Sequence, residues 1–261
     1  MAPPPPLLAE DEPPAVVVEN PGGRSPFFLT CDHAGRRLPR RLGALGLPES
    51  ELERHIAWDI GAADAARRVA EALDAILVMQ PYSRLVIDCN RAPGLATSIV
   101  RISELTPIPG NENVSEAEAT ARVEVIFRPY HDRIAVELER REREERPTLL
   151  VSVHSFTPVF KGEPRRMQVA VLYNRDPRFA RLMHGLLLAE GDLVVGDNDP
   201  YAVSDETDYT VPVHGERRGL PHVELEIRQD LIADEAGQRA WADRLVRLLR
   251  TAYERFTSDA A

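Results

Sequence analysis

The feature that most constrains the fold is an alternation of short apolar runs with longer segments of helical periodicity. Apolar or β-branched residues dominate the runs Phe27–Asp32, Ala75–Gln80, Leu85–Cys89, Leu149–Val153, Val169–Tyr173, Leu193–Val195 and Val223–Ile227. Such an alternation is typical of an α/β fold, in which helices cover a mostly parallel sheet. Because the runs are almost continuously apolar, we expect most of these strands to be covered on both faces.

Two sequence signatures mark where helices should begin. Ser50–Glu53 has the order of a capping box, and apolar residues follow it at helical spacing as far as Leu73. A second capping box, Ser115–Glu118, opens a longer segment, which Pro129 should kink or divide. Further helices are expected at Pro177–Glu190 and Ala233–Phe256.

The N-terminal segment differs in composition from the rest of the chain. Residues 1–26 are rich in proline, which fits neither a helix interior nor a central strand, so we expect a proline-rich N-terminal tail. Within it, only Ala15–Glu19 could add a short edge strand. Residues 27–261 show no repeat and no linker, and 43% of the chain is hydrophobic, so we expect a single α/β domain there.

The charge and the cysteines exclude several classes of protein. The chain has 32 basic and 42 acidic residues, and its formal charge of −10 argues against nucleic acids and anionic membranes as partners. No apolar stretch approaches the roughly 20 residues of a membrane span, and the N-terminus lacks the pattern of a secretory signal. Cys31 and Cys89 stand alone in apolar runs, so we expect reduced thiols in a cytoplasmic protein.

Side chains able to bind a metal or a substrate follow several of the predicted strands. They are Asp32 and His33, Asn90 and Arg91, His154, Asn174 and Asn198. In an open parallel sheet, ligands bind beyond the carboxyl ends of the strands. Each of these residues alone could equally be a cap or a turn residue, but their recurrence favours one shared site at that edge of the sheet.

Acidic residues supply further candidates. Glu224 and Glu226 lie two apart in the last predicted strand and therefore point to the same side of the sheet. A buried, unpaired carboxylate is costly, so at least one should meet a cation or a reacting centre, unless both pair with an arginine such as Arg228. His55 and Asp59 lie four apart on one helical face, and Asp59 is the better candidate because it stands nearer the core.

Six short motifs stand in a distinctive order along the chain. They are Cys31–Gly35, Trp58–Gly61, Ser83–Arg91, Pro129–His131, Ser152–Phe156 and Glu226–Asp230. In that order they resemble the N-formylglutamate amidohydrolase family. The resemblance implies a three-layer α/β/α hydrolase fold with a mostly parallel mixed central sheet, related to the zinc carboxypeptidases. It also implies cleavage of N-formyl-L-glutamate to formate and glutamate, usually in histidine degradation, with a divalent metal that we expect to be zinc.

By position, the resemblance implies roles for several of the candidate residues. His33 and His154 resemble the metal ligands, and Glu226 resembles the catalytic glutamate of the carboxypeptidases. Asn90 and Arg91 resemble the pair that grips a substrate carboxylate in those enzymes.

One departure concerns the second metal ligand. Zinc carboxypeptidases take two ligands from an HxxE motif, whereas His33 is followed three residues later by Arg36, which cannot ligate zinc. Asp59 is therefore the favoured second ligand and Asp32 the next candidate, while a site without metal remains an alternative.

The implied chemistry assigns a task to each group. His33, Asp59 and His154 would supply two nitrogens and one oxygen, a common set for catalytic zinc. Glu226 could take a proton from the attacking water and hand it to the departing nitrogen. Arg84 would help to stabilise the negative charge that develops on the carbonyl oxygen.

A substrate with two carboxylates needs more than one cation. Arg91, assisted by Asn90, can pair with one carboxylate, and Arg84 or Arg101 could meet the other. Residues of the late loop are expected to line the site or close over the substrate, namely Asn198, Tyr201, Tyr209 and His214. His131 either supports the site or belongs to the core.

These observations favour a metal-dependent amidohydrolase of N-formyl-L-glutamate or a similar small, anionic N-acyl amino acid. One alternative is a deacylase or carboxypeptidase-like enzyme for another acyl amino acid. A second is a non-catalytic domain that binds a carboxylate ligand, an option that the missing HxxE motif leaves open. A serine-triad hydrolase and a phosphate-binding loop are disfavoured because the sequence contains no GxSxG and no GxxxxGK[ST].

Overall fold

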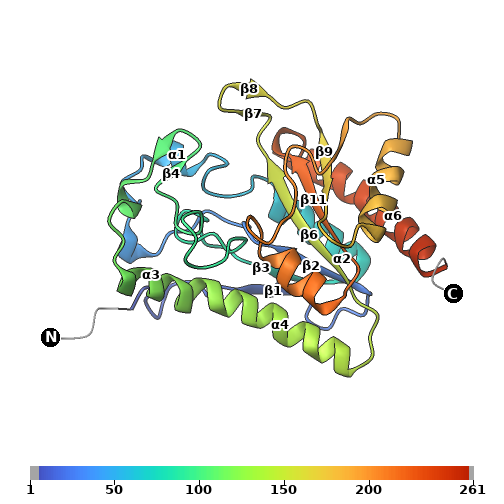
Figure 1. The fold of residues 1–261 in the computed structure, drawn as a ribbon, viewed down its shortest axis with the longest axis horizontal. Coiled ribbons are helices and arrows are strands. Elements are labelled where there is room, and N and C mark those ends of the chain that lie inside the picture. The colour runs from blue at the N-terminus through green and yellow to red at the C-terminus, as the bar shows by residue number, and fades with distance from the viewer. Residues whose placement is uncertain (1–5, 259–261) are drawn as a thin grey trace.

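The computed structural model describes residues 6–258, and its centre is a seven-stranded mixed sheet (Figure 1). The strand order is β1 (Val17–Glu19), β3 (Ile76–Met79), β2 (Phe27–Cys31), β6 (Leu149–Phe156), β11 (His222–Arg228), β9 (Val169–Leu172) and β10 (Val195–Asp197). The four central strands β3, β2, β6 and β11 are parallel to one another. β1 runs antiparallel to β3, and the parallel pair β9–β10 runs antiparallel to β11.

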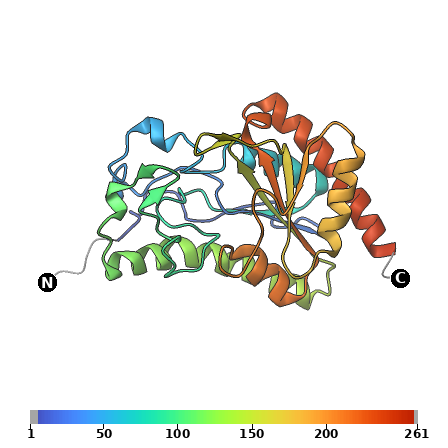
Figure 2. The same ribbon diagram turned by 45° about the horizontal axis from the view of Figure 1, so that its top comes forward.

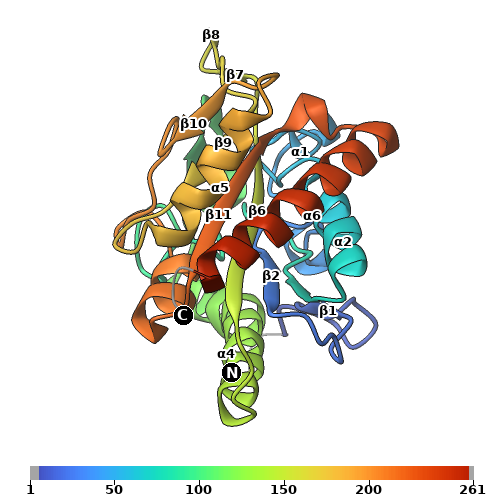
Figure 3. The same ribbon diagram turned by 90° about the vertical axis from the view of Figure 1, so that its right-hand side faces the viewer.

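Helices cover both faces of the sheet, which makes three layers. On one face lie α2 (Ala62–Leu73), α5 (Arg178–Ala189) and α6 (Glu235–Ser258), and Figure 3 looks onto α6 with α2 and α5 on either side of it. The opposite face carries α4 (Arg128–Arg143), which lies below the sheet in Figure 2. This confirms the predicted three-layer α/β fold with a mostly parallel mixed sheet.

Side chains of β2 point alternately into two core clusters, one on each face of the sheet. Leu29 packs in the cluster formed with α2, α5 and α6, whereas Phe28 packs with Tyr130 and Ile134 of α4. Successive side chains of a strand point to opposite faces, so a strand covered on both sides needs apolar residues at every position. All five residues of β2 are buried.

The long helix predicted after Ser50 is instead two separate helices. α1 (Glu49–Leu52) is one turn long and follows Pro48, so Ser50 lies inside it and does not cap it. α2 begins only at Ala62, after a turn that ends at Gly61 with φ +78°.

The second predicted helix is confirmed in outline. The Ser115 side chain accepts a hydrogen bond from the Glu118 amide at the start of α3 (Glu116–Arg122). A π-helical segment at Val123–Phe127 then separates α3 from α4, and Pro129 lies in the first turn of α4.

The predicted strand Leu85–Cys89 is wrong, because this segment forms turns and irregular chain. Its apolar side chains are nevertheless buried, with Leu85, Val86, Ile87 and Cys89 each 0% exposed. An apolar run indicates that a segment is buried, and a buried loop can have the same apolar pattern as a strand. The remaining elements are the hairpins β4 (Ile102–Ser103)–β5 (Thr106–Pro107) and β7 (Val159–Phe160)–β8 (Glu163–Pro164), with short 3₁₀ or π turns at Arg40–Leu42, Pro109–Asn111, Val211–Gly215, Glu216–Arg218 and Gln229–Leu231.

Residues of the N-terminal segment before Phe27 pack against the core beside α4. Leu7 is 1% exposed in the core cluster beside α4, and Ala15 is buried with it. The edge strand expected at Ala15–Glu19 is present as β1, where Val18 pairs with Val78. Residues 1–5 of the predicted tail lie outside the described residues. Among residues 6–258, no helix combines the length and the apolarity that a membrane span requires.

Candidate active site

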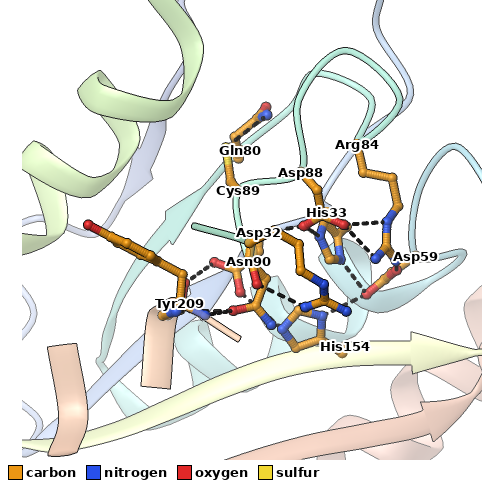
Figure 4. Close-up of polar contacts among 12 residues, drawn as sticks. Asp32, His33, Asp59, Gln80, Arg84, Asp88, Cys89, Asn90, His154 and Tyr209 are labelled. Carbon is orange, nitrogen blue, oxygen red and sulfur yellow. Dashed lines mark hydrogen bonds and ion pairs between the residues drawn. The ribbon is translucent and has the colours of Figure 1, made fainter. Parts of the chain in front are cut away.

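Three buried side chains that could bind a metal meet at the carboxyl edge of the central strands. His33 follows β2, His154 lies in β6, and Asp59 lies in the turn before α2. One donor atom of each lies within 4.8 Å of the other two. Asp59 Oδ2 is 3.3 Å from His33 Nδ1 and 2.8 Å from His154 Nδ1, and Figure 4 shows both imidazoles directed toward this carboxylate.

The fold explains why these distant segments meet. β2 and β6 are parallel neighbours, so their carboxyl ends share one edge of the sheet. The Asp59 amide donates to the His33 carbonyl at 3.0 Å, which fixes the turn against the end of β2. Gly61 closes this turn against the chain before α6, since a Cβ atom there would lie 2.0 Å from the Ile232 carbonyl oxygen.

The outer nitrogen of each histidine is held by another carboxylate. His33 Nε2 lies 2.8 Å from Asp88 Oδ1, and His154 Nε2 lies 3.1 Å from Asp32 Oδ2. Histidines that bind metals typically donate their second ring N–H to a carboxylate or a carbonyl, which leaves the other nitrogen free to ligate. With the hydrogens on Nε2, both Nδ1 atoms face Asp59 as lone-pair donors. This donor set of two nitrogens and one oxygen fits a zinc ion.

The two other residues discussed as ligands have different surroundings. Asp32 lies behind His154 and accepts hydrogen bonds from the hydroxyls of Tyr130 at 2.6 Å and Thr210 at 2.7 Å. Arg36 turns away to Glu49, 2.5 Å distant. The position that follows His33 by three residues therefore contributes nothing to this centre, and Asp59 occupies the place between the histidines.

A cavity of about 440 Å³ opens beside the three residues. His33, Asp59 and His154 line it together with five other predicted site residues, namely Arg84, Asn90, Arg91, Tyr201 and Glu226. Glu226 stands opposite His154 in the register of β11 and β6, is 8% exposed, and has one carboxylate oxygen without a hydrogen-bond partner. Glu224 also lines the cavity and also has one unpartnered oxygen.

Burial and neighbouring charges act in opposite directions on these carboxyl groups. Burial raises the pKa of Glu226 to about 7, although His154 works against the shift. At Asp59, burial also favours the neutral acid, but His33 and His154 outweigh it and lower the pKa of the carboxyl. Asp59 therefore stays ionised, whereas Glu226 can exchange a proton near neutral pH.

The arginines are held by acidic partners. Arg84 donates to Asp88 Oδ2 at 2.6 and 3.0 Å and reaches Asp59 at 3.5 Å. Arg91 donates to the Asn90 carbonyl at 2.8 Å and lies 3.4 Å from Asp208.

Asn90 anchors the late loop. Its Nδ2 donates to Asp208 at 3.1 Å, and its Oδ1 accepts from the amides of Tyr209 and Thr210. These hydrogen bonds tie the late loop to the wall of the cavity, and Figure 4 shows the contact between Asn90 and Tyr209.

Two predicted substrate contacts are not brought to the cavity. Arg101 is exposed and is not among the lining residues. Asn198 accepts a hydrogen bond from the Tyr173 amide and lies at the other edge of the sheet, because β9 and β10 run against β11. For the same reason, Asn174 after β9 lies away from the cavity, and its side chain donates a hydrogen bond to Glu216.

Three more candidates pack beside the site without lining the cavity. His131 and His214 are stacked, with 3.0 Å between Nδ1 and Nε2, and Tyr209 packs against His131. Sequence reasoning missed Asp88 and Asp208 as cavity residues. Asp88 stands four residues after Arg84 in the motif Ser83–Arg91. Because a strand was expected there, the ion pair between these two residues was not predicted.

The fold and the site together define an α/β hydrolase. The family model described as N-formylglutamate amidohydrolase matches residues 25–233. The chain belongs to the N-formylglutamate amidohydrolase family and is a hydrolase that acts on an amide bond. None of the curated proteins compared with the chain matches it.

Two solved structures show the same architecture. The gene product Atu2144 from Agrobacterium tumefaciens is 39% identical, with a TM-score of 0.93, and the match covers 96% of this chain and 99% of that one. N-formylglutamate amidohydrolase from Ralstonia eutropha is 20% identical, with a TM-score of 0.66, over 92% of this chain and 97% of that one. The similarity to the Ralstonia eutropha structure shows that the two proteins share a fold.

Proposed function

We propose that this protein is a metal-dependent amidohydrolase that cleaves small N-formyl amino acids to formate and the amino acid. N-formyl-L-glutamate, the compound named by the family, is the first substrate to test. The observation that carries the proposal is the buried group of His33, Asp59 and His154, with both outer imidazole nitrogens held by carboxylates and Glu226 opposite His154.

These three residues would hold the divalent ion, and zinc fits their donor atoms. A bound zinc ion would polarise the scissile carbonyl and make a nearby water more acidic. Glu226 would accept the proton of the attacking water and deliver it to the leaving nitrogen, a task that suits a carboxyl with a pKa of about 7. Arg84 would direct its guanidinium at the negative charge that develops on the carbonyl oxygen.

The other cavity residues would position the substrate. Arg91 retains donors beyond those bound to Asn90 and Asp208, and its side chain is 23% exposed, so it can pair with the substrate's α-carboxylate. Asn90 would hold the late loop in place through its hydrogen bonds to residues 208–210. Tyr201, at 39% exposure, would cover the mouth of the cavity.

The cellular setting is part of the same proposal. Cys31 and Cys89 are buried free thiols, which suit a reducing compartment, so we place the protein in the cytoplasm. If N-formyl-L-glutamate is the physiological substrate, the reaction belongs to histidine degradation.

Formate release tests the proposal directly. The purified chain, loaded with zinc, should release formate from N-formyl-L-amino acids, and a chelator that strips the metal should abolish the release until zinc is restored. N-acetyl and N-succinyl analogues are the comparison substrates. Faster cleavage of these analogues would favour a deacylase of another acyl group, and unchanged turnover after complete removal of metal would reject the metal-dependent mechanism.

A further inference from the structure

One charged side chain beside the cavity has no role in the proposed mechanism. Arg165 directly follows β8, and the hairpin β7–β8 extends beyond the carboxyl end of β6 (Figure 3). The Arg165 amide donates to the Pro158 carbonyl at 2.8 Å, and the Arg165 carbonyl accepts a hydrogen bond from Arg228 at 3.4 Å. The backbone of Arg165 is therefore held at the base of the hairpin.

Aromatic rings hold the Arg165 guanidinium against the wall of the cavity. Its Cζ lies 4.6 Å from the ring centroid of Phe160, 4.7 Å from that of Tyr201 and 5.7 Å from that of Phe156. All three aromatic residues line the cavity. A guanidinium within about 6 Å of a ring centroid is attracted by the negative face of the ring. This contact positions the guanidinium without neutralising its charge.

The end of the Arg165 side chain lacks an acceptor. Its Nη1 is buried and has no hydrogen-bond partner, and an unpaired buried donor is costly. Arg84 and Arg91, by contrast, each face a carboxylate of the protein, at 2.6 Å and 3.4 Å. A substrate anion at the aromatic wall would supply the acceptor that Arg165 lacks.

The aromatic wall lies within reach of a substrate held at the three proposed metal ligands. His154 and Phe156 are two apart in β6, so their side chains point to the same face of the sheet. Two residues of a strand span about 7 Å. An N-formyl amino acid whose formyl group is at His154 can therefore extend a side chain of glutamate length toward Phe156 and Arg165.

Two carboxyl groups of the cavity do not oppose a second substrate anion there. Glu104 is already bound by Arg54 and by the Lys161 amide. Burial raises the pKa of Glu224 well above its ordinary value, so this carboxyl is neutral near pH 7 and can donate a hydrogen bond to an anion.

We propose that Arg165 binds the side-chain carboxylate of the substrate and gives the site its preference for N-formyl dicarboxylic amino acids. This inference rests on the proposed N-formyl amidohydrolase function and deepens it, because it assigns the recognition of the side chain to one residue. Arg91 holds the α-carboxylate, Arg84 faces the carbonyl oxygen, and Arg165 Nη1 donates to the distal carboxylate. An uncharged side chain of the same shape forms a weaker hydrogen bond with Arg165.

N-formyl-L-glutamate and N-formyl-L-glutamine provide the test, because they have nearly the same shape and differ by one charge. In the zinc-loaded full chain, kcat/KM should be at least about tenfold higher for the glutamate compound, which corresponds to about 1.4 kcal/mol. Arg165→Gln should remove most of this ratio, while kcat/KM for the glutamine compound stays within about threefold of wild type. A wild-type preference for the glutamine compound, or an unchanged ratio in Arg165→Gln, would overturn the inference.

Arg166→Gln is the matched control, because Arg166 is the next residue and is exposed. It removes the same charge from the same segment and should leave the ratio unchanged. An equal loss of the ratio in Arg166→Gln and Arg165→Gln would reject the assignment to Arg165. If circular dichroism shows that Arg165→Gln does not fold, Arg165→Lys replaces it. Lysine lacks the flat guanidinium, so the ratio should fall by at least about threefold, and an unchanged ratio would reject the inference.

A binding measurement distinguishes failure of this inference from failure of the proposed function. If wild type releases formate from neither compound, the proposed function fails, and calorimetric titration of both compounds into the zinc-loaded chain still tests Arg165. Tighter binding of the glutamate compound to wild type than to Arg165→Gln supports the inference, and equal binding rejects it.

Discussion

The position of Glu226 and the pKa of its carboxyl depend on the neighbouring strand β6 and on burial. The register of β11 and β6 sets its carboxyl opposite His154, and burial brings its pKa to about 7. Arg228, the partner expected for it in a purely structural role, binds Asp230 instead. Glu226 is therefore free to serve as the proposed proton acceptor.

Replacing Glu226 by glutamine should lower kcat by about 10²- to 10⁴-fold, because the amide cannot accept the water's proton. Zinc content should stay at the wild-type level, since Glu226 is outside the group of three proposed ligands. Steady-state formate release and metal analysis of the purified variant provide the two readouts. Turnover within about threefold of wild type would be incompatible with this role, as general-base catalysis contributes far more.

The sequence indicates some site residues better than others. His33 and His154 stand at or near strand ends, and Asp59 stands on the inner face of a turn beside them, so strand ends and burial are sufficient to select them. Asp88 could not be found in this way. Its role depends on the fold of a buried loop, and the apolar residues around it have the pattern of a strand.

At the scale of elements, strand direction decides which loops reach the site. An apolar run has the same composition in either direction, so the antiparallel orientation of β9 relative to β11 was invisible in the sequence. That orientation carries Asn198 to the wrong edge of the sheet. The prediction of one helix between Ser50 and Leu73 was also wrong because of a tertiary contact. The close approach of Gly61 to Ile232 imposes a turn there despite the helical spacing of the apolar residues.

Gly61 gives an element-scale prediction. Gly61→Ala should lower the free energy of unfolding by about 2–5 kcal/mol, because alanine is strained at φ +78° and its Cβ would meet the Ile232 carbonyl. Urea unfolding measures the loss. Gly191→Ala is a matched control, since Gly191 has φ +77° with open space around a Cβ, and only the backbone strain of about 1–2 kcal/mol applies there. Equal losses in the two variants would contradict the close approach at Gly61.

For the whole molecule, the buried pair His131–His214 links stability to pH. Burial lowers the pKa of His131 to about 4 and that of His214 to about 3. The geometry agrees, because His131 Nε2 donates to the Cys89 carbonyl and its Nδ1 can then accept from His214 Nε2 only while unprotonated. The folded state thus binds fewer protons than the unfolded state between about pH 4 and 6.5, and stability falls as the pH drops through that window.

Comparison with a variant isolates this contribution. Between pH 7.5 and pH 5, wild type should lose about 2 kcal/mol more unfolding free energy than His131→Gln, which lacks the titrating group. Urea unfolding at the two pH values gives the difference. His184→Gln, which leaves the pair intact, should follow wild type. Identical pH dependence in wild type and His131→Gln would show that the pair does not titrate in this range.

The position of β11 has a consequence for biosynthesis. Among residues 6–258 it is the last sheet strand in sequence order, yet it pairs with β6 on one side and β9 on the other. Until the ribosome has supplied it, β1–β3–β2–β6 and β9–β10 are two separate ribbons, and His154 has no carboxylate opposite it. The two parts of the sheet can therefore join, and the site can be completed, only after residues 222–228 have been synthesised.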